Sequence, residues 1–193
     1  FLEVSCSNSS QPRLNLNDSI LEQTFSPQEL AGVDQIIRFM DSTAFAGCNC
    51  QNLENAYANL KYTPEIFNQT KFDKVIADMK ADGLYRSFWN IGLQSDSINA
   101  TYLDFNMNGK LFKLVERLSE VDEVAREYYG YLMRDRDISP ALVAMFPANF
   151  PKVDVSRPAV RLLIATHLMF LKESEKYSKK RMAPLRIEDM DSD

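Results

Sequence analysis

The sequence predicts an all-α protein, an irregular bundle of about six helices with little or no sheet. Three observations support this fold class. A capping residue followed closely by proline recurs at points where a helix would begin. Apolar residues then return every three or four positions, which places them on one face of a helix. Segments with the polar–apolar alternation of a half-buried strand are nearly absent.

The first predicted helix illustrates the reasoning. Ser26 is a suitable cap, Pro27 fits the first helical position, and Glu29 completes a capping box. Apolar residues then recur at helical spacing as far as Met40, so we expect a helix over 27–43. The same signals give the other segments, in chain order: helices at 51–61 and 64–84, the latter broken near 68–70; a stretch at 84–93 that fits either a helical turn or a short strand; an extended piece at 101–105; and helices at 110–134, with Ser119 as an internal cap, at 140–145 and at 158–179.

With 193 residues, the chain is long enough for one domain with a full hydrophobic core. We expect a flexible tether over residues 1–25, a single helical domain over 26–180 and a disordered acidic tail over 181–193. The net charge of −5 argues against a dedicated nucleic-acid binder, because phosphate contacts need clustered Lys and Arg. The most apolar stretch, at 160–171, is too short to span a bilayer.

The chain has three cysteines and one histidine, too few for a disulfide scaffold or a zinc finger. For Cys48 and Cys50 we expect free or mixed-disulfide thiols in a loop, with a small ring between them as the alternative. Metal clusters, phosphate-binding loops and nucleophile motifs are not apparent either. We therefore expect no cofactor and a non-enzymatic binding module.

The segment 104–109, DFNMNG, matches the first half of a calcium-binding EF-hand loop. Asp104, Asn106 and Asn108 stand at the alternate positions where oxygen ligands surround the ion. The twelfth position needs a bidentate Glu, but Val115 occupies it. We therefore expect an Asx/Gly turn that caps the following helix, and keep a calcium-modulated protein as the alternative.

Aromatic residues and the single histidine give the candidates for a ligand or partner surface: Tyr85, Trp89, Tyr128, Tyr129, Tyr131 and His167. Aromatic stripes usually belong to a core, but neighbouring tyrosines on one helix cannot all face inward, so at least one of the last three tyrosines should be exposed. A histidine in an apolar helix is usually a packed residue. The alternative is a small hydrolase-like enzyme that uses His167 with carboxylates from other helices.

Cys6 is the candidate lipid anchor. Ser5 is the small residue that precedes a lipidated cysteine, and Leu2 and Val4 resemble the end of an apolar signal core. Glu3 stands where Leu or Val is usual, so an ordinary cysteine is the alternative. Four glycosylation sequons would fit a secreted protein of a eukaryotic host, at Asn8, Asn17, Asn68 and Asn99.

Four segments resemble a known family: SPQELAGVDQIIRFMDS, YLDFNMNGKLFKLVERL, DISPALVAMF and RPAVRLLIATHLMFL. They are similar to segments of small, uncharacterised all-helical lipoproteins of Gram-negative bacteria, over roughly residues 20–175 of this chain. The resemblance implies a lipoprotein on the periplasmic or surface side of a bacterial cell envelope, and it implies no activity. We therefore expect a module that meets the membrane through its anchor and interacts with another envelope protein.

Overall fold

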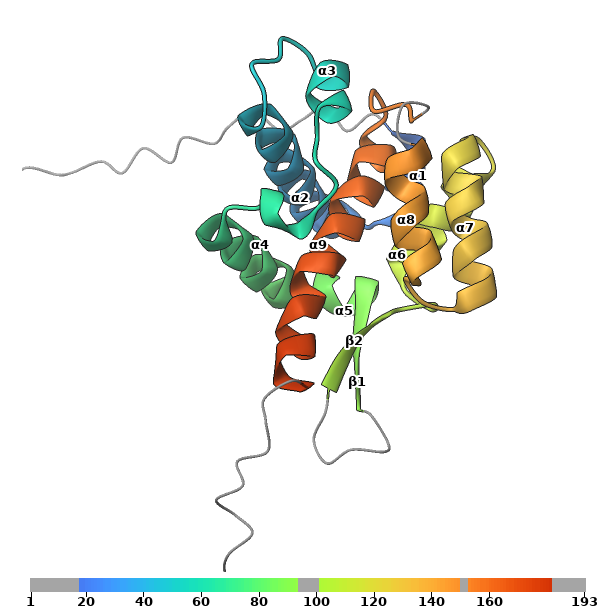
Figure 1. Cartoon of the computed structure of the whole chain (residues 1–193). Coiled ribbons are helices and arrows are strands. Elements are labelled where there is room, and N and C mark those ends of the chain that lie inside the picture. Colours follow the sequence, from blue (N-terminus) through green and yellow to red (C-terminus); the bar gives the residue numbers. More distant parts are fainter. Residues whose placement is uncertain (1–17, 94–100, 150–152, 182–193) are drawn as a thin grey trace, which may run out of the picture.

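The computed structural model describes residues 18–93, 101–149 and 153–181. Within them the chain forms nine α-helices, one 3₁₀-helix (η1) and one pair of strands (Figure 1). The elements are, in chain order: α1 (Ser19–Thr24), α2 (Pro27–Ala46), α3 (Leu53–Ala58), η1 (Pro64–Ile66), α4 (Gln69–Ala81), α5 (Leu84–Phe88), β1 (Trp89–Leu93), β2 (Thr101–Phe105), α6 (Lys110–Ser119), α7 (Glu123–Asp135), α8 (Pro140–Asn149) and α9 (Pro158–Arg181). The all-α class is confirmed, with more helices than the six expected.

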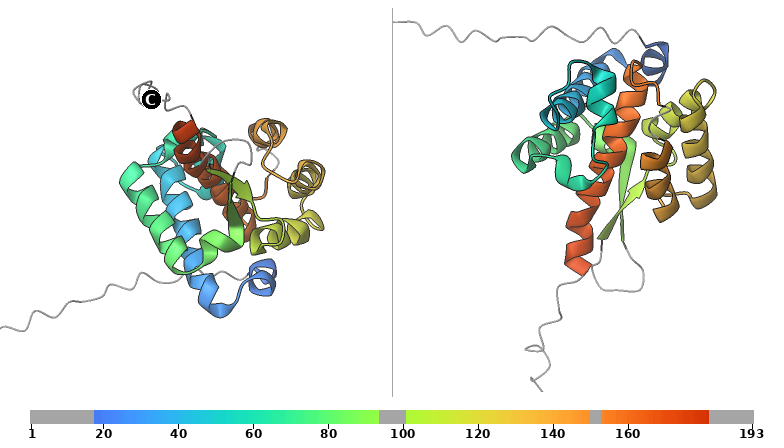
Figure 2. Two further views of the ribbon diagram at one scale, coloured as in Figure 1. Left: turned by 90° about the horizontal axis from the view of Figure 1, so that it is seen from below. Right: turned by 45° about the horizontal axis from the view of Figure 1, so that its top comes forward.

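Helix α9 is the centre of the fold. Figures 1 and 2 show α2, α3 and α4 on one side of it and α6, α7 and α8 on the other. It contacts α1, α2, η1, α6 and β2. Every residue from 159 to 170 is buried, so this half of the helix is covered all round. Such a helix belongs inside the core of a protein, because no stripe of it faces water.

The predicted helix starts are confirmed where the capping residues act locally. At α2, the Ser26 hydroxyl accepts a hydrogen bond from the Glu29 amide, and the Glu29 carboxylate accepts one from the Ser26 amide. The break expected near 68–70 is also present, because Asn68 caps α4 by accepting from the Lys71 amide at 3.1 Å. These caps satisfy backbone donors that have no partner within the helix.

The domain starts earlier than predicted, so the expected tether over 1–25 is wrong from residue 18 onward. Asp18 caps α1 through the Ile20 amide at 3.0 Å, and its other oxygen accepts from the Ala159 amide of α9 at 3.1 Å. Leu21 and Phe25 enter the core. Residues 1–17, with the candidate anchor Cys6, lie outside the described residues, as do residues 182–193 of the expected acidic tail.

The long helix predicted at 110–134 is two helices, α6 and α7. The cap of the second helix is Asp122, which accepts from the Ala125 amide at 2.8 Å. The predicted internal cap, Ser119, instead ends α6, and its hydroxyl donates to the Glu116 carbonyl. Both residue types are good caps, so the choice between them depends on how the two helices pack together.

The ambiguous segment 84–93 contains both of the structures it could fit, a turn of helix in α5 followed by strand β1. The extended piece at 101–105 is confirmed as β2, which pairs antiparallel with β1. Trp89 lies opposite Phe105 on the buried face of this small sheet. The described residues thus contain one two-stranded sheet, which packs against α9. The expectation of little or no sheet is confirmed for this part of the chain.

Cys48 and Cys50 form a disulfide, so the expectation of separate thiols is wrong and the ring alternative is confirmed. Helix α2 ends at Ala46, and the turn that follows brings the two Cα atoms within 5.3 Å. This separation lies in the usual range for a disulfide.

Candidate functional site

A cavity of about 780 Å³ lies where the end of α4, helix α5 and strand β1 meet. It has the size expected of a small-molecule site. Its lining combines cationic, aromatic and apolar residues: Lys80, Ala81, Gly83, Tyr85, Arg86, Trp89, Asn90 and Ile91. This lining makes the cavity the best candidate for a functional site within the described residues.

The chain reaches this arrangement through a sharp change of direction at Gly83. Helix α4 ends at Ala81, and Gly83 adopts a left-handed conformation with φ of +79° before α5 begins. Glycine accepts this conformation without the steric cost of a Cβ atom. The turn brings Lys80 back over Tyr85, whose ring centre lies 4.5 Å from the Lys80 ammonium.

The aromatic wall of the cavity is continuous with the core. Tyr85 and Trp89 meet edge to face with ring centres 5.1 Å apart, and Trp89 also contacts Phe170 of α9. Trp89 is only 1% exposed, and its indole Nε1 is buried without a hydrogen-bond partner in the described part of the chain. A buried donor without a partner is costly, so the position of this ring is set by its packing against Tyr85 and Phe170 and not by a hydrogen bond to a described residue.

A buried carboxylate stands behind this wall. Glu173 of α9 is 1% exposed, and its Oε1 accepts from the Tyr85 hydroxyl at 3.3 Å and from Lys80 at 3.4 Å. Lys176 lies 2.8 Å from the other oxygen as an ion pair. Two lysines thus compensate one buried carboxylate, as burial of a charge requires. Burial, the Tyr177 hydroxyl and the Glu173 charge together raise the pKa of Tyr85, so its hydroxyl stays protonated.

Arg86 supplies a second positive charge to the cavity. Its side chain is exposed, and no hydrogen bond or ion pair joins its guanidinium to the residues that the structure describes. The backbone around it is fixed, because the Arg86 carbonyl accepts from the Asn106 amide group at 2.7 Å. Arg86 is therefore available for an anion, whereas Lys80 is shared with Glu173.

The structure divides the aromatic candidates from the sequence. Tyr85 and Trp89 line the cavity, whereas Tyr128 and His167 lie in the core on α7 and α9. The Tyr128 hydroxyl is 3.1 Å from His167 Nδ1. Burial lowers the pKa of His167 to about 3, so the ring is neutral near pH 7. At 2% exposure it does not reach a substrate in solvent, which removes support from the hydrolase-like alternative.

Tyr129 and Tyr131 of α7 are not among the described residues that line the cavity, and both remain partly exposed, as expected for neighbours of a buried tyrosine. Tyr129 packs against Phe112 of α6 with ring centres 5.6 Å apart. The Arg134 guanidinium lies 4.6 Å from the Tyr131 ring centre. Of the aromatic candidates in the described part of the chain, only Tyr85 and Trp89 therefore line the cavity.

The residues of the calcium alternative take part in a turn and a strand. Asn106 Oδ1 accepts from the Asn108 amide at 3.1 Å, which is the expected Asx turn. The expectation that this turn caps the following helix is wrong, because Gly109 precedes α6 and no side-chain hydrogen bond caps that helix. Asp104 lies on β2 beside Asp137, and burial together with that second carboxylate raises its pKa. Among the described residues, no three His, Cys, Asp or Glu side chains gather as metal ligands would.

Sequence reasoning misses the two cavity cations, Lys80 and Arg86. Gly83 predicts the end of a helix, but nothing local shows that the chain turns back at that point. The sequence indicates Trp89 and Tyr85 only as members of an aromatic group.

No family model, curated protein or solved structure matches this chain. In the part of the chain that the structure describes, none of the helices has the length and apolar character needed to cross a membrane.

Proposed function

We propose that this chain is a binding module for a small organic anion, held in the cavity between α4, α5 and β1. The observation that carries the proposal is the exposed guanidinium of Arg86, which lines the cavity and has no hydrogen bond or ion pair to the described residues. A ligand with acceptor oxygens satisfies this group. The rings of Tyr85 and Trp89 add an apolar wall.

An aromatic carboxylate fits these features best. Its ring packs against the aromatic wall, and its carboxylate accepts two parallel hydrogen bonds from the planar guanidinium of Arg86. Lys80 contributes charge to a lesser degree, because Glu173 already engages it at 3.4 Å. A neutral ligand of the same shape lacks the interaction with Arg86.

Trp89 is the only tryptophan in the chain, so its fluorescence reports directly on the cavity. We expect benzoate to produce a saturable change in this fluorescence, and benzamide, its neutral counterpart, to bind roughly tenfold more weakly or worse. Replacing Arg86 by Gln should weaken benzoate binding by a similar factor.

Lys113→Gln is the matched control, because it removes one positive charge from an exposed position on α6. This variant should bind benzoate as the unmodified chain does. Equal affinity for benzoate and benzamide, or equal losses in the two variants, would contradict the proposal.

We also propose that the module is tethered to the outer face of a bacterial membrane through a lipid on Cys6. Ser5 directly before Cys6, and the apolar Leu2 and Val4 ahead of it, support this location.

Intact mass spectrometry of the protein from the membrane fraction of its native host tests the tether. We expect a chain that begins at Cys6 and carries a diacylglyceryl group and an acyl chain. A chain that retains residues 1–5, or that carries sugar on Asn68, would be evidence against the tether.

A further inference from the structure

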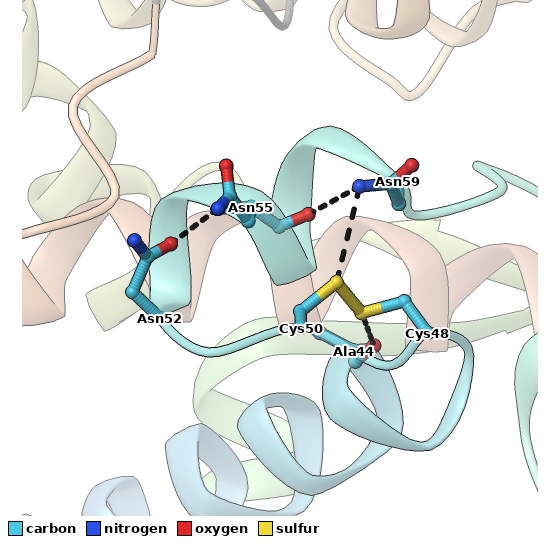
Figure 3. Close-up of a disulfide and its surroundings, with 6 residues drawn as sticks. All are labelled: Ala44, Cys48, Cys50, Asn52, Asn55 and Asn59. Atoms are coloured by element: carbon cyan, nitrogen blue, oxygen red, sulfur yellow. Dashed lines mark hydrogen bonds between the residues drawn. A yellow bond between two sulfur atoms is a disulfide. The ribbon is translucent and has the colours of Figure 1, made fainter.

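The Cys48–Cys50 disulfide lies in the loop between α2 and α3 and closes a ring across a single residue, Asn49 (Figure 3). Both cysteines are partly exposed, so a thiol from solvent has access to the bond. A ring this small restrains little chain entropy. Opening it therefore costs the fold little, unlike a disulfide that joins distant parts of a chain.

The two sulfur atoms have different surroundings. Cys48 follows the last turn of α2, and its Sγ lies 3.7 Å from the Ala44 carbonyl oxygen. A disulfide sulfur carries no hydrogen, so the oxidised Cys48 does not donate a hydrogen bond to Ala44, and the two atoms are only in van der Waals contact. After reduction, the carbonyl oxygen accepts from a Cys48 thiol but repels a thiolate. The negative end of the α2 helix dipole also disfavours a thiolate at Cys48.

Cys50 faces a hydrogen-bond donor instead. The Asn59 side-chain nitrogen lies 3.9 Å from Cys50 Sγ, and the same nitrogen donates to the Asn55 carbonyl at 2.8 Å (Figure 3). The bond to Asn55 fixes the amide in place beside the sulfur. An N–H group directed at a sulfur atom stabilises the thiolate form, so Cys50 is the better leaving group of the pair.

We propose that this ring is a thiol–disulfide exchange site for small-molecule thiols, with Cys48 as the sulfur that is attacked. The thiolate of the small molecule forms a bond to Cys48 Sγ, the Cys48–Cys50 bond breaks, and its electron pair leaves on Cys50 Sγ. A second thiolate attacks the small-molecule sulfur of this mixed disulfide and releases Cys48 as a thiolate. In total, two small thiols are oxidised to their disulfide, and the protein disulfide is reduced to two cysteines.

This activity goes beyond the proposed anion binding and occupies another part of the molecule. Figure 1 places α3 and the β1–β2 ribbon at opposite ends of the fold. Loss of one function therefore does not entail loss of the other, and the two proposals can fail separately.

The test uses the full chain with Cys6→Ser, so that the third cysteine does not react. The protein is exposed briefly to 2-mercaptoethanol, acidified, and treated with N-ethylmaleimide, and the labelled peptides are identified by mass. We expect the mercaptoethanol adduct on Cys48 and the maleimide on Cys50, in roughly tenfold excess over the reverse pattern. Adducts shared equally, the reverse pattern, or no reaction at millimolar thiol would each overturn the proposal.

Variants at Asn59 test the role of the amide. This residue is exposed, so its replacement should leave the fold intact, which the melting temperature checks. Asn59→Leu removes the N–H group and should slow ring opening roughly three- to tenfold. Asn59→Asp keeps the shape but places a carboxylate beside the sulfur, and should slow it further. The attacking 2-mercaptoethanol thiolate is an anion that the new carboxylate also repels, so the uncharged variant Asn59→Leu decides the role of the N–H group. Unchanged rates in both variants would contradict the assignment of Cys50 as the leaving group.

Discussion

His167 makes the stability of this protein sensitive to acid. Burial lowers its pKa from the usual 6.5 to about 3, so the folded chain binds this proton less readily than the unfolded chain. Above pH 6.5, His167 is neutral in both the folded and the unfolded chain, and its protonation does not lower the free energy of unfolding. As pH falls from 6.5 to 3, the free energy of unfolding decreases by up to about 1.4 kcal/mol per pH unit.

Urea denaturation at pH 7 and at pH 4.5 measures this effect. We expect His167→Gln to lose less stability between the two pH values than the unmodified chain, because glutamine does not titrate. Tyr128→Phe is the control, since it removes only the hydroxyl 3.1 Å from His167 Nδ1 and should retain the pH dependence. Equal pH dependence in the unmodified chain and His167→Gln would mean that other groups dominate acid unfolding.

At the level of elements, the contact between α5 and α6 depends on a glycine. Gly109 stands directly before α6, and a Cβ atom at this position would collide with the backbone carbonyl oxygen of Ser87 in α5. A backbone atom held within a helix cannot rotate away as a side chain does. The absence of a side chain at Gly109 thus permits the close approach of the two helices.

We expect Gly109→Ala to lower the free energy of unfolding by about 1–3 kcal/mol, as overpacking does. Gly130 is the matched position, because it lies within α7 and faces open space where a Cβ atom would stand. Gly130→Ala should raise the free energy of unfolding by about 0.5–1 kcal/mol, since alanine favours helices. Urea denaturation of both variants checks this, and changes of the same sign would refute the assignment.

The helices that could be predicted are those whose signals are local. The Ser26 capping box and the Asn68 cap act within one turn of their own helices, and both are present. Helix α1 was not predicted, because its six residues are too few to show a periodic apolar pattern. Its stability depends on packing and on Asp18, which binds the Ala159 amide far along the chain.

At the scale of the whole molecule, the candidate site could be predicted only in its aromatic part. The cavity exists because Gly83 reverses the chain and because β1 leads from α5 into the sheet. The pairing of Lys80 with Glu173 joins residues that are 93 positions apart, and no sequence pattern shows it. The cysteine spacing allows a ring, but only the turn after α2 decides that it closes.

Polar contacts also join the elements around α9. Arg161 is buried and donates to Asp41 of α2 at 3.0 Å, and the Tyr57 hydroxyl of α3 donates to the other Asp41 oxygen at 2.7 Å. Burial raises the pKa of Asp41, and this effect outweighs the lowering by the Tyr57 hydrogen bond and the Arg161 charge. These directional bonds fix how three helices dock, in addition to their apolar contacts.

The central place of α9 has a consequence for biosynthesis. A ribosome makes this helix after every other described element, yet α1, α2 and α6 bury apolar surface against it. The growing chain therefore cannot complete its core before α9 has emerged from the ribosome. An unfolded chain is also the form that threads through a secretion channel, which suits the location proposed for this protein.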